Sequence, residues 1–385
     1  MQFEFARSIH AAAAPSWNAL LADDYPFARH EFLAALEDSQ AVGEASGWLP
    51  RHLLVRDGDT LVAALPGYLK EHSYGEYVFD WAWADAYQRY GQRYYPKWIN
   101  AIPFTPCRGP RLLGQPDHNT IAAITQTLDN YCLRESLSGW HCLFPDQSVS
   151  EALSQAGSAR RLGCQFHWFN RNYRTFDDFV ATFTSRKRKN VLKERRRVRE
   201  QGFQFTTLTG AAIEPYHWQF FYQLYQRTYL KRSGHGGYLN EAFFQALGQN
   251  LADHCVLVLA QLDGQTVAAA LYLCDQHTLY GRYWGCLAEF DNLHFETCYY
   301  QGIDYAIAQG LTRFDGGAQG EHKLARGFEP VLTYSNHHLC DPRFAAAVED
   351  FVREEGEMTQ GYFNDAAAHL PYTQPTPNNP PSQKD

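Results

Sequence analysis

The stretch Leu279–Phe328 reads LYGRYWGCLAEFDNLHFETCYYQGIDYAIAQGLTRFDGGAQGEHKLARGF. Its pattern predicts a strand over 279–284, a helix over 293–309, a short strand over 312–315 and a polar loop over 316–328. Ionisable side chains fall at the expected helix start and in the loop, where glycines flank them. Because glycine lets a backbone approach a ligand closely, we expect the reaction centre here.

The composition is that of a globular protein. The 385 residues exceed what one ordinary core needs, so two domains are expected. The nine cysteines are scattered without a CxxC pair, which argues against a disulfide framework and against a structural zinc site. No segment has the pattern of a signal peptide or the length and hydrophobicity of a membrane span. We therefore expect a cytoplasmic protein that holds no metal.

Two segments resemble each other at a constant offset. LLVRDGDTLVAAL at 53–65 lies over LAQLDGQTVAAAL at 259–271, with the Asp-Gly turn, the Thr and the Ala-Ala-Leu in common. Each segment predicts a β-hairpin. A third strand, a helix and a fourth strand are expected after each hairpin, and in the first half the third strand falls at 77–83 and the helix at 84–92. An internal duplication accounts for this match better than chance similarity between two hairpins.

One segment concentrates positive charge. Nine of the 34 basic residues lie between Arg186 and Arg199 against a single acid, Glu194, so this segment is about +8 and the remaining chain about −16. The absence of Gly and Pro over 182–201 predicts one helix, ended by Gly202. Such an excess fits the phosphates of a nucleotide-linked or lipid-linked acceptor, or a nucleic-acid backbone such as tRNA held by charge alone. A solvated surface helix is the plainer alternative.

Several short motifs, taken together, resemble those of one known family. They are His30–Leu33, Pro103–Pro106, Gly109–Arg111, Phe166–Trp168, Ser185–Asn190, Gly281–Gly285, Leu293–Gln301 and Gly317–Phe328. With them, nearly the whole chain resembles the FemAB-like predicted N-acyltransferases, and the last two motifs are the most specific. The resemblance implies an α/β (α+β) fold of two tandem GNAT-like domains, each with a mixed, mainly antiparallel sheet flanked by helices.

The expected domains follow from this resemblance and from the repeat. An N-terminal domain covers 1–162, and a C-terminal domain with the active site covers 163–370. The tail 371–385 is rich in Pro, Asn and Gln, which predicts disorder. By kinship with enzymes that add amino acids to peptidoglycan precursors, the resemblance implies transfer of an acyl or aminoacyl group from an activated carrier to an amine of an anionic acceptor, such as a cell-wall precursor or a peptide.

One connection departs from the pattern of acetyltransferases that use coenzyme A. These enzymes hold the pyrophosphate on a glycine-rich loop at a helix start, where backbone N–H groups meet the helix dipole. Here the connection 285–294 lacks such a loop and carries Glu289 and Asp291, whose charges disfavour a phosphate. We therefore expect no tightly bound cofactor, and both acyl-CoA and aminoacyl-tRNA stay open as co-substrates.

Acyl transfer to an amine needs groups that move protons and groups that bind the anionic reactants. The candidates for proton transfer are Glu296, Tyr300, Glu321 and His322. The candidates for substrate binding are Arg282, Trp284, His294, Gln319, Lys323, Arg326, Arg186, Lys187, Lys189 and Arg108. Direct attack by the bound amine is expected, because no Ser or Cys has a base at a useful spacing.

Two plainer interpretations compete with this assignment. Glu296 is equally expected as a satisfied buried carboxylate, and Glu321–Arg326 as a salt-bridged loop packed on the domain. The alternative function is a non-catalytic protein of the same fold, which holds RNA or an anionic precursor through the basic helix at 182–201.

Overall fold

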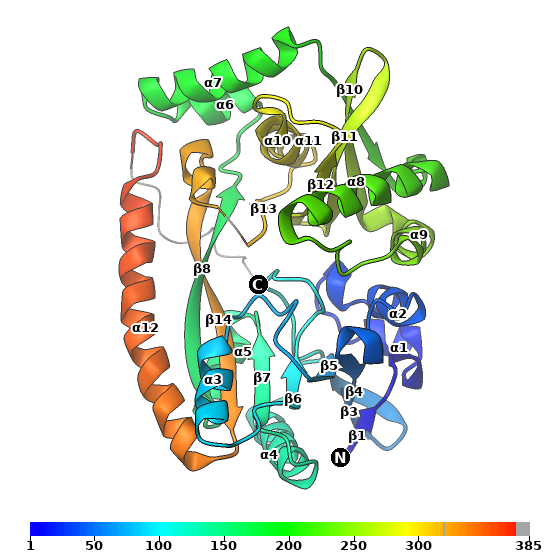
Figure 1. Ribbon diagram of the computed structural model, residues 1–385, viewed down its shortest axis with the longest axis vertical. Coiled ribbons are helices and arrows are strands. Elements are labelled where there is room, and N and C mark those ends of the chain that lie inside the picture. Colours follow the sequence, from blue (N-terminus) through cyan, green and yellow to red (C-terminus); the bar gives the residue numbers. More distant parts are fainter. Residues whose placement is uncertain (319, 375–385) are drawn as a thin grey trace. The chain divides into compact units, whose positions relative to one another are not determined.

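The computed structural model describes residues 1–318 and 320–374 and divides into two compact units (Figure 1). Unit 1 consists of 1–164 and 332–361, and unit 2 of 165–331 with the described residues from 362 onward. The predicted boundary after residue 162 lies two residues from this division. The segment 332–361, which was predicted to belong to the second domain, packs with the first.

Unit 1 contains two sheets. The smaller is antiparallel, in the order β1-β3-β4, and consists of β1 (Gln2–Ala6), β3 (His52–Asp57) and β4 (Thr60–Leu65). The larger has the order β2-β5-β6-β7-β14 and consists of β2 (Trp48–Pro50), β5 (Gly67–Lys70), β6 (Lys97–Asn100), β7 (Gly139–Leu143) and the unit 1 part of β14 (Glu329–Leu339). The helices are α1 (Ala14–Asn18), α2 (His30–Asp38), α3 (Trp81–Arg89), α4 (His118–Arg134) and α5 (Gln147–Gln155).

Strand pairing and apolar burial explain why 332–361 belongs to unit 1. Ser335–Leu339 of β14 pairs antiparallel with β7. Phe344, Val348 and Val352 of α12 (Pro342–Ala368) then pack in one buried cluster with Trp83 and other aromatic residues of unit 1. Burying such side chains is favourable by about 1.5–3 kcal/mol each. Local sequence patterns do not reveal a strand partner almost 200 residues away.

The predicted strand at 77–83 is wrong. Tyr77 has a positive φ of 61°, which a strand does not allow, and α3 already begins at Trp81. The segment instead folds so that Glu76 and Asp80 reach the buried ammonium group of Lys97. An ion cluster therefore decided the local conformation over the hydrophobic pattern.

The duplication exists, but the sequence match locates it wrongly. The hairpin at 53–65 belongs to the small sheet, whereas the hairpin at 259–271 belongs to the main sheet of unit 2. The two turns also fall at different positions of the matched sequences. Asp57 pairs with Thr60 across the first turn, whereas Leu262, which lies over Arg56 in the match, pairs with Gln265 across the second. The repeat lies instead in the strand order. The strands β2-β5-β6-β7-β14 of unit 1 correspond to β10-β11-β12-β13-β8 of unit 2. In both series the successive pairings are antiparallel, antiparallel, parallel and antiparallel.

Unit 2 has one mixed sheet in the order β8-β13-β12-β11-β10-β9. Its strands are β8 (Ala159–Phe169, in part), β9 (Gln204–Thr209), β10 (Cys255–Leu262), β11 (Gln265–Cys274), β12 (Thr278–Cys286) and β13 (Arg313–Asp315). The helix predicted at 182–201 is α7 (Ser185–Glu200), which is slightly shorter than predicted. A separate helix, α6 (Phe176–Ala181), precedes it. α8 (Pro215–Ser233) packs against β12 and α9 (Glu241–Asn250), while α11 (Gln301–Ala308) contacts β12 and β13.

Three local irregularities place the candidate site in unit 2. Arg282 is an extra residue in β12, because Leu271 pairs with Tyr283 and Tyr272 with Gly281. The predicted helix at 293–309 contains a π-helical turn, η6 (Glu296–Tyr300), between α10 (Leu293–Phe295) and α11. The predicted polar loop contains a 3-10 helix, η7 (Glu321–Arg326). β-bulges and π turns are over-represented at functional sites.

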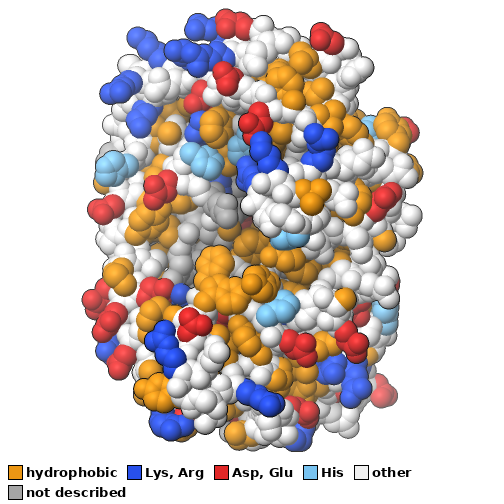
Figure 2. Space-filling view, in the orientation of Figure 1, with side chains coloured by type: hydrophobic (Ala, Val, Ile, Leu, Met, Phe, Trp, Pro, Cys, Tyr) orange, Lys and Arg blue, Asp and Glu red, His pale blue; other side chains and the backbone are white. Residues whose placement is uncertain are grey.

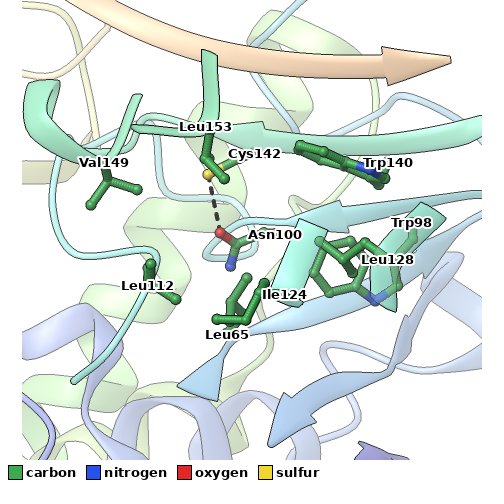
Figure 3. A pocket seen from close by; sticks show the side chains of 10 residues that line it. All are labelled: Leu65, Trp98, Asn100, Leu112, Ile124, Leu128, Trp140, Cys142, Val149 and Leu153. Atoms are coloured by element: carbon green, nitrogen blue, oxygen red, sulfur yellow. Dashed lines mark hydrogen bonds between the residues drawn. The ribbon is translucent and has the colours of Figure 1, made fainter. Parts of the chain in front are cut away.

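The strands of unit 1 present different chemistry on their two faces. Trp98 and Asn100 of β6 line an apolar gap beneath α4 and α5 together with Trp140 and Cys142 of β7, and Cys142 Sγ donates to Asn100 Oδ1 at 3.1 Å (Figure 3). Because side chains alternate along a strand, the intervening residue His141 faces the other side.

Two further parts of the chain bear on the expectations. Of the predicted tail, Pro371–Gln374 is described, and Tyr372 donates to the carbonyl of Gly327 at 2.6 Å, whereas 375–385 lies outside the described residues. Within residues 1–318 and 320–374, no helix combines the length and the hydrophobicity that crossing a bilayer requires.

Gly327 is expected to tolerate no side chain. It ends η7 at φ 84°, and an added Cβ would lie 2.7 Å from Phe179 and 2.8 Å from Phe183. Gly327→Ala should therefore lower the free energy of unfolding by about 2 kcal/mol, measured by urea denaturation. Gly361→Ala in α12 is the control, because its Cβ meets nothing within 4 Å and alanine favours a helix. Equal stability of the two variants would contradict this account.

Candidate functional site

A tyrosine–histidine pair lies at the centre of the candidate site in unit 2. Tyr299 of the π turn and His322 of η7 form a hydrogen bond of 2.9 Å between the hydroxyl and Nε2. Burial raises the pKa of Tyr299, so the hydroxyl keeps its proton and is able to donate it to His322. When the tyrosine donates, His322 Nε2 is the acceptor and the ring carries its hydrogen on Nδ1.

Aromatic rings surround this pair. His294 lies with its ring centroid 5.5 Å from that of Tyr299, 5.4 Å from Trp284 and 6.3 Å from His322. Phe295 lies 5.6 Å from His322. The structure therefore brings the predicted residues Trp284, His294 and His322 together around a tyrosine.

The two histidines of the site are held neutral. Burial lowers the pKa of His294 to about 4, and the cations Arg232, Arg326 and Lys323 lower it further along with His322. The pKa of His322 is lowered by burial and by the same three cations. A neutral imidazole that accepts a hydrogen bond is able to take up a proton during a reaction.

Glycine fixes the position of the His322 ring. Gly320 precedes η7 with φ 109°, and an added Cβ would lie 2.1 Å from Cε1 of His322. Only glycine therefore allows the ring to lie against the backbone at this point.

The end of β13 supplies a buried charge cluster behind the pair. Lys323 is 1% exposed and donates from Nζ to the carbonyl of Gly317 at 2.6 Å. Asp315 accepts from the amide of Gly317 at 2.8 Å, and His167 Nε2 lies 3.6 Å from the same carboxylate. The pKa of Asp315 is lowered, since His167, this amide and Lys323 outweigh burial. Lys323 thus holds the turn after β13 in place.

Glu296 and Tyr300 point away from the Tyr299–His322 pair, toward α7. Arg195 of α7 donates to Glu296 at 2.9 Å and to Asp304 at 2.6 Å, and Gln301 donates to Glu296 at 2.8 Å. Burial raises the pKa of Glu296, although Arg195 and Gln301 oppose that shift.

A second ion pair joins α7 to η7. Tyr300 donates to Glu194, and Arg326 donates to the same carboxylate at 2.9 Å and to the carbonyl of His322 at 2.7 Å. The guanidinium of Arg326 also lies 3.4 Å from the ring centre of Phe295. Glu194 therefore connects α7, the π turn and the segment that carries His322.

The remaining predicted residues that the structure describes make contacts of their own. Glu321 is exposed and accepts from Tyr362 at 2.9 Å, and Arg282 donates to Tyr283 at 3.1 Å. Arg108 belongs to unit 1, with Nε 3.5 Å from Asp146. Arg186, Lys187 and Lys189 lie at the start of α7. Gln319 lies outside the described residues.

Sequence reasoning missed Tyr299, Arg232, Glu194 and Arg195. Tyr299 adjoins the predicted Tyr300, but the π turn shifts the helix phase, so that neighbouring tyrosines face different partners. Arg232, Glu194 and Arg195 lie far away in sequence, and only packing brings their charges near. Within the described residues, no group of three His, Cys, Asp or Glu is placed to hold a metal ion.

Solved structures of low sequence identity share this fold. FemX is 11% identical with a TM-score of 0.55, over 89% of this chain and 99% of FemX. A conserved protein of unknown function from Bacteroides thetaiotaomicron VPI-5482 is 12% identical with a TM-score of 0.53, over 88% of this chain and 100% of that one. The C-terminal domain of a putative lysylphosphatidylglycerol synthetase from Agrobacterium fabrum is 9% identical with a TM-score of 0.53, over 88% and 95%.

The comparisons identify the fold class and the family of this chain. The predicted fold class, two tandem GNAT-like α/β units, is confirmed. A family model described as peptidoglycan biosynthesis/recognition matches residues 8–374, and the chain belongs to this FemAB-like family, as its motifs indicated. No curated protein matches the chain.

Arg195 and Arg196 are neighbours on α7, but substituting them should change the stability of the protein by very different amounts. Arg195→Met leaves the buried carboxylate of Glu296 without its cation, which should cost about 3 kcal/mol of unfolding free energy. Within the described residues Arg196 pairs with exposed Glu200 alone, so Arg196→Met should change stability by less than about 0.5 kcal/mol. Chemical denaturation of both variants checks this. Similar stabilities would show that the Arg195 contacts do not fasten α7.

Proposed function

We propose that this protein is an N-acyltransferase that moves an acyl or aminoacyl group from an activated carrier to an amine of an anionic acceptor. The observation that carries the proposal is the hydrogen-bonded pair of Tyr299 and neutral His322, next to Lys323, which holds the turn after β13. Membership of the FemAB-like family, with its description of peptidoglycan biosynthesis/recognition, favours a cell-wall precursor or a peptide as the acceptor.

The pair provides a route for the proton of the attacking amine. As the amine nitrogen bonds to the carbonyl carbon, its proton passes to Tyr299 Oη, while the tyrosine proton passes to His322 Nε2. The reverse movement delivers a proton to the leaving group when the bond to the carrier breaks. Positioned proton transfer of this kind contributes about 10²–10⁴-fold to a rate.

Arg232 is the cation we propose for binding the anionic reactant. Lys323 and Arg326 face the same histidines, but their donors are engaged with Gly317, Glu194 and a backbone carbonyl. Arg232 is exposed at the end of α8, and its charge lowers the pKa of both site histidines. An exposed guanidinium beside two neutral imidazoles suits a carboxylate or phosphate.

The surface of α7 favours aminoacyl-tRNA over acyl-CoA as the carrier. Lys and Arg side chains gather over α7 (Figure 2, upper left). Seven of them have no acidic partner within the described chain: Arg186, Lys187, Arg188, Lys189, Lys193, Arg197 and Arg199. The connection before α10, where coenzyme A binds in other acetyltransferases, presents the exposed carboxylates Glu289 and Asp291 instead.

Tyr299→Phe should test the proposed proton route. The variant should lose transfer activity by about 10²-fold, measured by mass spectrometry of the product with aminoacyl-tRNA or acyl-CoA donors and peptidoglycan-precursor amines. Tyr305→Phe, on the same helical segment and outside the site, should retain the wild-type rate. Because the route needs neutral His322, whose pKa lies below 6.5, the wild-type rate should stay level down to about pH 6.5 and then fall. Full activity of Tyr299→Phe would refute the route.

The same cations support a second candidate function, a binding protein that holds RNA without catalysis. A row of cations on one helix follows a repeated phosphate chain better than it fits a single small anion.

Salt dependence distinguishes these possibilities for α7. Binding of polyuridylic acid should weaken steeply with salt, and Lys189→Glu with Lys193→Glu and Arg197→Glu should flatten the slope by roughly 0.7 for each lost phosphate contact. Arg343→Glu with Arg353→Glu, which reverses two exposed charges on α12, is the control. RNA binding without acyl transfer from any donor would favour the binding protein, and no RNA binding would remove α7 from both functions.

A further inference from the structure

A row of hydrogen-bonded ionisable groups lies buried in unit 1, on the sheet face opposite the gap of Figure 3. Ser335 Oγ lies 2.8 Å from His337 Nε2, and His337 Nδ1 lies 2.8 Å from His141 Nδ1. His141 Nε2 lies 3.5 Å from the hydroxyl of Tyr94, which is 2.5 Å from Asp80 Oδ2. All five residues are at least nine-tenths buried.

The acidic end of this row sets one consistent direction for its hydrogen bonds, including the longest one, the 3.5 Å contact between Tyr94 and His141. Lys97 donates to Asp80 and lowers the pKa of that carboxylic acid to about 2, so Asp80 is ionised and only accepts. Tyr94 must therefore donate to Asp80, and its oxygen is left to accept from His141 Nε2.

The same reasoning extends through both imidazoles. Burial, among other causes, lowers the pKa of His141 to about 3 and that of His337 well below its usual value, so each ring is neutral with one donor and one acceptor. His141 donates from Nε2 and accepts at Nδ1, which obliges His337 to donate from Nδ1. His337 Nε2 then accepts from the hydroxyl of Ser335.

The result is the arrangement of an activated serine. A hydroxyl donates to a neutral imidazole, and the far nitrogen of that imidazole donates into a chain that ends at a carboxylate. The edge of Trp83 against the His337 ring, with centroids 4.8 Å apart, fixes the plane of the base. Residues 335 and 337 share one face of β14, because side chains alternate along a strand.

We propose that unit 1 contains a second reactive centre, in which Ser335 is the nucleophile, His337 its base, and His141, Tyr94 and Asp80 positioning residues, and that Ser335 accepts an acyl group from activated esters. Ser335 Oγ bonds to the ester carbonyl carbon while its proton passes to His337 Nε2. The bond from that carbon to the leaving oxygen then breaks, and His337 returns the proton to the leaving oxygen. Burial of Ser335, at 4% exposure, restricts the acyl group to a small one. This proposal is independent of the transfer chemistry in unit 2.

Full-length protein treated with p-nitrophenyl acetate provides the test. We expect one acetyl group on Ser335, located by peptide mass spectrometry and removed by hydroxylamine, which cleaves an ester on serine and leaves acetyl-lysine intact. Ser335→Ala should lose this adduct. Ser138→Ala should keep it, because Ser138 is a buried serine of the same unit outside the hydrogen-bonded row.

Two variants separate the base from the positioning residues. His337→Gln should slow the acetylation by about 10²-fold or more. Tyr94→Phe should slow it less and alter its pH dependence, because the His141 tautomer is no longer fixed. An unmodified Ser335 in the folded wild-type protein, or acetylation at the same rate in folded His337→Gln, would overturn the proposal. The wild-type result decides the matter even if a variant fails to fold.

Discussion

The short parallel pairing between β12 and β13 is the constraint on which the candidate site depends. Only Thr278–Tyr280 pairs with Arg313–Asp315. Beyond that point β12 continues with β11, while β13 ends at Asp315 and is followed by Gly316 and Gly317. Backbone groups at such a split lack a strand partner and must be satisfied otherwise. Lys323 and Asp315 satisfy two of them around Gly317, and this contact fixes the start of the segment that presents His322.

Helix α7 carries two sets of charged residues, one on its inner face and one on its outer face. Its inner residues Glu194 and Arg195 form ion pairs with η7, the π turn and α11. These pairs are partly shielded from solvent, so removing one partner leaves a poorly solvated charge. Most of the outer cations are exposed, while Lys187 and Arg188 are half-buried, and this is the surface we propose for a polyanion. Because the two sets share one helix, a partner bound outside would act on the same rigid element that holds Tyr300 and Arg326.

The two units have the same topology but place their ionisable residues at different positions on it. Each has the same succession of strand pairings around a central parallel pair. In unit 2 the candidate site lies where the parallel pair ends, on a helical turn and a loop. In unit 1 the ionisable residues lie within the strands, where Lys97, His141 and His337 share one buried face. Fold similarity alone therefore says little about which groups react in either unit.

The sequence by itself determined the fold class, the family and the segment that holds the candidate site, because hydrophobic period, turn residues and short motifs are local signals. It located His294, His322 and Trp284 for that reason. Only the tertiary structure decided that Tyr299 faces His322, that Arg195 neutralises Glu296, and that 332–361 returns to unit 1. These outcomes depend on strand pairing and buried charge between distant segments, together with a π turn that shifts the helix phase by one residue. None of these features produces a periodic pattern in the sequence.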